Sequence, residues 1–295
     1  MGKIETIIVD GESLNATSAD NLFEKINIFP QDDLSAIEIN LQKVKFVDPY
    51  GLVTLCLIGR HLKNRCHDIS ISLPDCAECQ SYLYSMNFVS VMEKFSHIKN
   101  IASNLASGQS INHDVVIELT KIEKKSAEPN KDIGDVLNRL DALLRDQLNY
   151  GDKEISSLSN IISELCYNIK DHSEDEGFVA VQRYQRKTDG KRYVVIGVGD
   201  LGVGIKASLG RRVDISSLNH LEAIIHALKK DASAYPERGL GLYMVSKITR
   251  DYAGTLHIRS GNARLHLRHN PRGVETADFP GTQVSISLSE IEKSS

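Results

Sequence analysis

The stretch GDLGVGI, residues 199–205, directly follows a strand-like segment at residues 193–198. An aspartate at the end of a strand can accept a hydrogen bond from the exocyclic amine of a purine, and glycines let the backbone approach a ligand without an obstructing Cβ atom. Neither the dinucleotide fingerprint GxGxxG nor a P-loop ending in GK[ST] occurs in the chain. The stretch therefore favours a nucleotide site of another kind, with four candidate residues: Asp200, Gly202, Gly204 and Ile205.

The stretch ELCYNIKDH, residues 164–172, lies upstream in a predicted helix from Ile155 to Asp171. Glu164, Asn168 and His172 are spaced by four residues, so they share one helix face. They border an apolar stripe made by Leu158, Ile161, Ile162, Leu165 and Ile169. The Asn oxygen suits Mg²⁺, and the Glu can orient or deprotonate an attacking water. The alternative is a plain amphipathic helix with a solvated face, in which His172 caps the C-terminal end.

Two further pieces contain glycine. RGLGLYMV, residues 238–245, enters a predicted helix from Gly241 to Tyr252, and the free N–H groups of such a helix start suit phosphates. Arg238 is the preferred contact to a terminal phosphate because it adjoins this glycine turn. Gly281 and Thr282 are expected to open the last strand, where the hydroxyl can help to hold a purine.

These four pieces, in this order, resemble the GHKL ATPase family, and the resemblance covers roughly residues 131–290. It implies a two-layer α/β sandwich, the Bergerat fold, that binds ATP and Mg²⁺. By resemblance, Asn168 coordinates the metal, Asp200 reads adenine, and residues 206–238 form a lid over the nucleotide. Gly202 and Gly204 would hinge that lid, and Gly239 and Gly241 would contact phosphates. The other implied site residues are Asp171, His172, Ile205, Arg238, Leu240, Leu242 and Thr282.

The N-terminal half is expected to be a separate α/β domain, residues 1–105. Its predicted strands are 4–9, 36–41 and 69–73, and its predicted helices are 19–28, 50–64 and 79–88. FVDPYGLVTL, residues 46–55, resembles the central turn of STAS domains, the fold of anti-anti-sigma factors. Phosphorylatable members have Asp-Ser where this chain has Asp48-Pro49-Tyr50, so the serine switch is expected to be missing. A neutral α/β scaffold that binds a partner or self-associates is the alternative.

Length and composition set the broader limits. A chain of 295 residues favours two domains, here joined by a connector at 106–130 that precedes a GHKL domain at 131–295. The hydrophobic share of 41%, the charged share of 25% and the net charge of −4 fit a soluble globular protein and do not indicate nucleic-acid binding. The longest apolar run is too short to span a membrane, and no secretory segment is visible.

Five scattered cysteines fit a reducing compartment, so a cytoplasmic protein is expected. Cys76 and Cys79 form a single CxxC. A structural zinc site usually has two such pairs, or one pair and two histidines. The pair is therefore open to metal or redox chemistry, or to a plain loop-to-helix junction.

The favoured function is a Mg-ATP-dependent ATPase in which Glu164 is the general base and the STAS-like domain reports the nucleotide state to a protein partner. An anti-sigma-type serine kinase that phosphorylates a partner in trans is one alternative, and a non-catalytic ATP sensor is another. A histidine kinase is disfavoured because the predicted upstream helix, residues 133–148, contains no histidine. The architecture suits bacterial signalling or defence by analogy. Homodimer formation is a further hypothesis, testable by light scattering with and without an ATP analogue.

Overall fold

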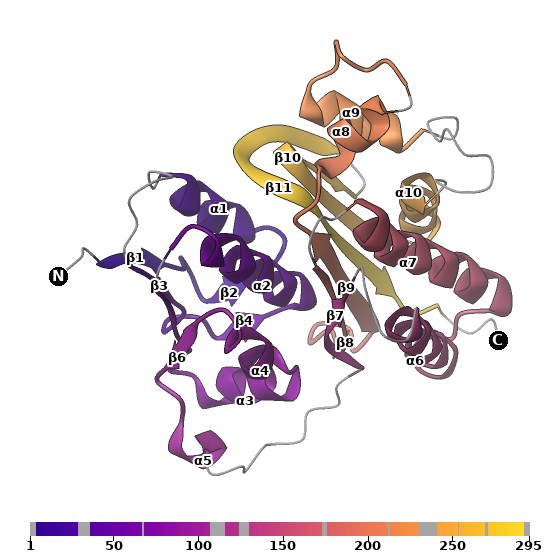
Figure 1. Ribbon diagram of the computed structural model, residues 1–295. Coiled ribbons are helices and arrows are strands. Elements are labelled where there is room, and N and C mark those ends of the chain that lie inside the picture. Colours follow the sequence, from indigo (N-terminus) through magenta and orange to yellow (C-terminus); the bar gives the residue numbers. More distant parts are fainter. Residues whose placement is uncertain are drawn as a thin grey trace.

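The computed structural model describes residues 4–28, 36–66, 68–106, 116–123, 130–172, 176–211, 213–229, 241–252, 254–268 and 271–291. Two α/β parts lie side by side, with the N-terminal part on the left in Figure 1 and the C-terminal part on the right. Among the described helices, none combines the length and the apolar character that crossing a bilayer requires.

The N-terminal part is built on a parallel sheet of order β1-β3-β5-β6. Its strands are β1 (Ile4–Ile8), β3 (Ala36–Asn40), β5 (Asp68–Ser72) and β6 (His97–Lys99), and a small pair is formed by β2 (Ser13–Leu14) and β4 (Phe46–Val47). Its helices are α1 (Ala19–Asn27), α2 (Pro49–Lys63), α3 (Ala77–Ser85), α4 (Phe88–Met92) and α5 (Ser103–Ala106). The predicted alternation of strands and helices is therefore confirmed.

The predicted helix 79–88 is divided into α3 and α4. Asn87 between them has a φ of 60°, in the left-handed region, which ends one helix and allows the next to start in a new direction. Cys76 is the N-cap residue of α3, and Cys79 is buried in its first turn, so the pair does lie at a loop-to-helix junction. The cysteines are free thiols, and no group of three or more potential metal ligands occurs in the ranges that the structure describes.

Helix α2 is apolar on nearly every side. Asp48 caps its N-terminus by accepting a hydrogen bond from the Gly51 N–H at 2.8 Å, and Pro49 occupies the first helical turn. Almost every residue from Pro49 to Leu62 is buried. A helix that is apolar all round must be covered on all sides, and α2 is covered by its own sheet on one side and by the C-terminal sheet on the other.

The C-terminal part has an antiparallel sheet of order β10-β11-β9-β8-β7. Its strands are β7 (Ile117–Ile122), β8 (Gly177–Gln185), β9 (Arg192–Asp200), β10 (Thr255–Leu267) and β11 (Arg272–Ser289). Helices α6 (Lys131–Leu148), α7 (Asp152–His172) and α10 (Gly241–Asp251) cover one face, which gives the expected two-layer α/β sandwich. Strand β7 lies within the range predicted as a connector, yet it pairs with β8 and so extends this sheet.

The opposite face of this sheet receives the N-terminal part. Phe178 and Ala180 of β8 belong to the same apolar cluster as α2. On β9, Gly197 and Gly199 leave room for this helix. A Cβ atom on Gly197 would lie 2.6 Å from the backbone carbonyl of Pro49, and one on Gly199 would lie 2.8 Å from a methyl carbon of Leu57. The two parts are therefore packed directly against each other through an apolar cluster to which both contribute.

Gly197→Ala is expected to lower the free energy of unfolding by about 1–3 kcal/mol, because the new methyl group meets helix backbone that cannot rotate away. Gly134→Ala is the matched control. Gly134 lies in α6 with nothing within 4 Å of a built Cβ, so the same change there should raise stability by about 0.5–1 kcal/mol. Urea unfolding of both variants measures the two changes in the free energy of unfolding. Equal changes would refute close packing of α2 on β9.

Two features correct the expectations for the end of the chain. The segment predicted as a lid, for which no helix was predicted, contains most of α8 (Gly204–Gly210) and all of α9 (His220–Ala227). Residues 212 and 230–240 lie outside the described ranges. Strand β11 starts at Arg272 rather than at Gly281, because β10 and β11 continue past the sheet as a long bent hairpin. This hairpin curves between α1 and the α8–α9 pair in Figure 1.

Candidate functional site

The candidate site lies on the helix-covered face of the C-terminal sheet, where β8 begins and β9 ends beside β10 and β11. Side chains alternate along a strand. Since Ile196 and Val198 of β9 lie in the core beneath the helices, Asp200 faces the same layer. By the same alternation Ser260 follows Leu256 and Ile258 of β10, and Thr282 precedes Val284 of β11. The strand register places Ser260 opposite Thr282, and Asp200 opposite Gly177.

Asp200 is buried, with only 9% of its surface exposed. Its Oδ1 accepts a hydrogen bond from the Gly202 N–H at 2.6 Å, and the Thr282 N–H also donates to this carboxyl group. Burial nevertheless raises the pKa of Asp200 to about 7, because removal from water disfavours the charge more than the two N–H groups favour it. A carboxyl group tuned in this way on a sheet end is typical of a binding site.

Ser260 links three segments of the site, and its side chain is 1% exposed. Its hydroxyl donates to the Gly281 carbonyl at 3.0 Å and accepts from the Ile205 N–H at 2.8 Å. The Thr282 hydroxyl lies 3.4 Å away. The sequence analysis did not select Ser260, because a serine alternating with apolar residues in a strand carries no distinctive pattern.

Gln283 is a second residue that the sequence analysis missed. Its side chain is fully buried on the opposite face of the sheet, and its Nε2 donates to the backbone carbonyl of Asp200 at 3.1 Å. It also donates to the Pro280 carbonyl at 3.0 Å. Gln283 therefore fixes the backbone on which the Asp200 carboxyl group is mounted.

Gly281 has a φ of +80°, and a Cβ atom on it would lie 2.0 Å from the carbonyl oxygen of Asp200. Gly281→Ala is therefore expected to displace Asp200 and to lower stability by about 2–4 kcal/mol. Gly11→Ala is the control for backbone conformation alone, because Gly11 has a φ of +77° and open space around it. That change should cost about 1 kcal/mol. Thermal unfolding compares them, and equal losses would argue against close packing at Gly281.

Helix α7 carries the predicted metal and catalytic residues along its outer border. Its apolar stripe is buried as predicted. Ile169 packs over Gly177, where a Cβ would lie 2.6 Å from an Ile169 methyl carbon, and Gly177 pairs with Asp200. Glu164 is half-buried, and Asn168 is exposed. The C-terminal end of α7 is therefore next to the Asp200 strand end.

The structure does not describe every predicted site residue. Arg238, Gly239 and Leu240 lie outside the described ranges, and so do the side chains of Asp171 and His172. Gly241 begins α10, and Leu242 packs against the core from its first turn. Gly202, Gly204, Ile205 and Thr282 all lie around Asp200 and Ser260, as described above.

The residues present suit a nucleotide with its metal. A buried carboxyl group matches the donor amine of adenine, and glycine backbone lies where side chains would collide, at Gly204 as well as at Gly281. Asn168 offers the kind of neutral oxygen that Mg²⁺ accepts. A separate pocket of about 420 Å³ lies in the lid region. Its lining includes Lys206 of α8 and His220 of α9, and it does not include Asp200.

An antiparallel sheet with helices on one face defines an α/β sandwich, and the aspartate-glycine turn at the end of β9 suits a nucleotide. Comparison with protein families gives the same class: residues 153–291 match the histidine kinase-, DNA gyrase B- and HSP90-like ATPases. This part of the chain is a GHKL-type ATPase domain, a class that binds ATP and includes ATPases and kinases. A comparison with curated proteins gives no match. Residues 1–152 lie outside the matched range, so the STAS-like assignment stays a prediction.

Proposed function

We propose that this chain is a Mg-ATP-dependent ATPase that works as a conformational switch, with the N-terminal part as its output domain. The observation that carries the proposal is the convergence of Asp200, Gly202, Ser260 and Thr282 at one sheet end next to α7. These groups come from strands far apart in the sequence, and they meet within a domain of an ATP-binding family.

The binding roles follow from the chemistry of each group. The Asp200 carboxyl group accepts the adenine amine, and Thr282 helps to fix the orientation of that carboxyl group through its backbone N–H. Asn168 would hold Mg²⁺, which would supply electrostatic stabilisation of the phosphates when bound. Gly241 would meet the phosphates at the start of α10, where helix N–H groups and the helix dipole favour anions. Arg238 and Gly239, which lie outside the described residues, stay predicted phosphate contacts.

Glu164 is the proposed general base. It lies one helical turn before Asn168, so its carboxylate shares the helix border that carries the metal ligand. A water held by this carboxylate loses its proton as it attacks the terminal phosphorus, and ADP leaves with the bridging oxygen. Inorganic phosphate and ADP are the products.

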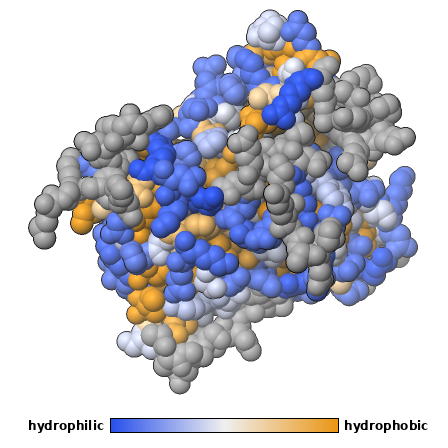
Figure 2. Space-filling view, viewed as in Figure 1, coloured by the Kyte–Doolittle hydropathy of each residue, from blue (hydrophilic) through white to orange (hydrophobic). Residues whose placement is uncertain are grey.

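The N-terminal part is suited to reporting the nucleotide state because it is packed on the sheet that carries the site. Gly197 and Gly199 contact α2 from β9, and the same strand ends in Asp200. A protein partner would bind the surface of this domain that the C-terminal part leaves open. Figure 2 shows a mainly hydrophilic face with apolar patches over the N-terminal part. Ile4 and Ile8 of edge strand β1 are among the exposed large apolar side chains.

A serine kinase acting in trans is the second candidate, and one observation bears on it. The hydroxyl groups at the STAS-like turn, on Tyr50 and Thr54, belong to fully buried residues. Phosphate transfer within the chain to this turn is therefore sterically blocked, so a kinase would need an acceptor hydroxyl elsewhere, which we propose lies on a separate protein.

The deciding experiment follows γ-labelled ATP with the purified full chain. Label released as inorganic phosphate supports the ATPase. Label transferred to an added STAS-domain protein supports the kinase. Tight ATP binding without either product would indicate a non-catalytic sensor.

A further inference from the structure

The hairpin beyond the sheet is bent by two irregularities in its pairing. The β10–β11 register shifts between Ser260 and Gly261, and again between Gly261 and Ala263. We call residues 261–268 and 271–280 the β-arm. Bulges leave backbone carbonyls without a ladder partner and turn a strand away from its sheet. Two adjacent residues of β10, Arg259 and Ser260, bond these carbonyls from opposite faces of the sheet.

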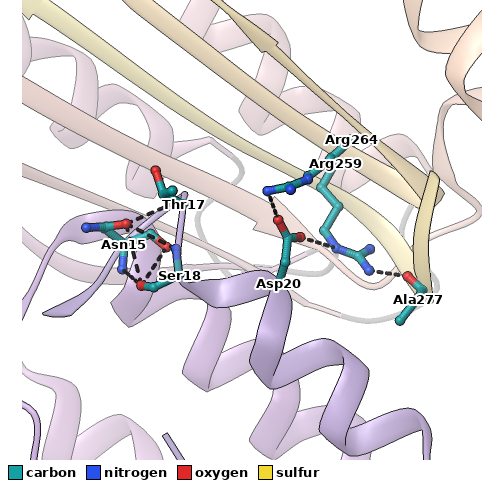
Figure 3. Close-up of polar contacts among 7 residues, drawn as sticks. All are labelled: Asn15, Thr17, Ser18, Asp20, Arg259, Arg264 and Ala277. Carbon is teal, nitrogen blue, oxygen red and sulfur yellow. Dashed lines mark hydrogen bonds and ion pairs between the residues drawn. The ribbon is translucent and has the colours of Figure 1, made fainter. Parts of the chain in front are cut away.

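Arg259 faces the N-terminal part and is fully buried. Its guanidinium donates to the carbonyl of Gly261 at 3.0 Å and to that of Ala277, both within the β-arm. The opposite charge comes from Asp20 of α1, whose Oδ1 lies 3.5 Å from the Arg259 Nε. Arg264 of the β-arm pairs with the other Asp20 oxygen, as Figure 3 shows. A buried guanidinium depends on such a partner, because an uncompensated charge in the core is strongly unfavourable.

Further contacts attach the β-arm to the N-terminal part. The Phe279 ring lies 4.5 Å from the Phe23 ring and 5.2 Å from the His61 ring, measured between centroids. The Asn27 side chain donates to the Asp278 carbonyl. The other side of the β-arm carries the lid helices: a Cβ on Gly261 would collide with the His220 ring of α9. The β-arm therefore lies between α1 and the lid.

Ser260 faces the nucleotide site, one residue along from Arg259. It bonds the Gly281 carbonyl, which belongs to the bulged segment, and the Ile205 N–H, which belongs to the first turn of α8. Any shift of the bulge moves Gly281, and with it the Ser260 hydroxyl that is bonded to the Gly281 carbonyl. The hydrogen bond from the Ile205 N–H to this hydroxyl, at the start of the lid, then changes as well. We infer that Ser260 is a positioning residue for the lid hinge, and that Asp20 of the N-terminal part sets its position through Arg259 and the β-arm. This inference rests on the proposed nucleotide site for its functional meaning.

Amide hydrogen exchange at Ile205 tests the inference in the nucleotide-free full chain. Ser260→Ala should speed this exchange by about five- to tenfold, and Ser260→Thr, which keeps the hydroxyl, should restore protection to within about twofold. Asp20→Asn should also speed it, because the variant loses the charge that fixes Arg259. Asn27→Ala loosens the β-arm from an exposed position, so it gives a second variant that does not disturb the core.

Asp10→Asn is the matched control. Asp10 is paired with Lys25 of α1 at 2.7 Å, and both residues belong to the N-terminal part, so exchange at Ile205 should stay as in wild type. Unchanged exchange in Ser260→Ala would overturn the positioning role. Equal exchange rates at Ile205 in Asp10→Asn, Asp20→Asn and Asn27→Ala would overturn the coupling to the N-terminal part.

Mg-ATP affinity gives the functional half of the test. Ser260→Ala should weaken binding by about three- to tenfold, and adding Asp20→Asn should weaken it little further, because both changes act on one contact. If the fold-losses in Mg-ATP affinity of the two single variants multiply in the double variant, Asp20 and Ser260 do not act through the same contact. If wild type binds no ATP, the proposed function fails, whereas the exchange rates at Ile205 still decide whether Asp20 controls the lid hinge.

Discussion

Glu164→Ala is expected to bind Mg-ATP with an affinity close to that of wild type and to lose about 10²- to 10⁴-fold in the rate of phosphate release. The half-buried Glu164 side chain lies on the border of α7, whose core-facing stripe is fixed by Ile161, Leu165 and Ile169. Removal of the carboxylate therefore leaves the helix packing intact and takes away the proton acceptor. Single-turnover measurement of phosphate release, beside equilibrium binding, separates the two effects.

Asn160→Ala is the control for this variant. Asn160 is exposed on α7 one turn before Glu164, so it shares the helix border but lies farther from Asn168. Its loss should change neither binding nor turnover. If Glu164→Ala releases phosphate at the wild-type rate, Glu164 is not the base. If it fails to bind ATP, Glu164 supports the pocket rather than the chemistry.

Asp200→Asn should weaken ATP binding by about 10- to 100-fold and at the same time change how stability depends on pH. Within the protein the carboxyl group already accepts N–H bonds from Gly202 and Thr282. An amide offers one accepting oxygen in place of two, and its NH₂ group cannot accept from the adenine amine. A lost hydrogen bond to a charged group has this magnitude.

The pH effect follows from the raised pKa of Asp200, which is about 7 because of burial, against 3.8 for the free side chain. The folded protein thus binds this proton more tightly than the unfolded chain does. Its contribution to stability is complete below pH ~4 and is lost as the pH rises to about 7. Asn cannot ionise, so the stability of Asp200→Asn relative to wild type should rise between pH 5 and pH 8.

Burial also raises the pKa of Asp48 to about 7, so Asp48 makes stability depend on pH in the same range. Asp48 is present in both proteins, so its effect cancels when their stabilities are compared. Urea unfolding of wild type and Asp200→Asn at pH 5, 6, 7 and 8 makes the measurement. A difference in stability that is constant over this range would show that Asp200 does not titrate there.

The sequence was informative where the chemistry requires particular residue types at fixed spacing. The apolar stripe of α7 and the Asp200 turn were predicted, because helical and strand periodicity and glycine placement are local properties. The two-layer sandwich was expected from the resemblance to the GHKL ATPases. The family match to residues 153–291 agrees with the class inferred from the four motifs. The individual roles of Glu164 and Asn168 stay predictions.

What the sequence did not predict depends on contacts between distant segments. Ser260 and Gln283 became visible only when the register of β9, β10 and β11 was known. The packing of Gly197 on Pro49 joins two domains that the sequence analysis treated separately. Helix α9 did have a local signal that was overlooked: Asn219 and Glu222 form a capping box.

Isothermal titration of the purified wild-type chain with ATP in the presence of Mg²⁺ shows whether the chain has a nucleotide site. We expect saturable binding of one nucleotide per chain, lost or strongly weakened in Asp200→Asn. Heat signals that never saturate for wild type, or equal affinity in Asp200→Asn, would contradict a nucleotide site built around Asp200.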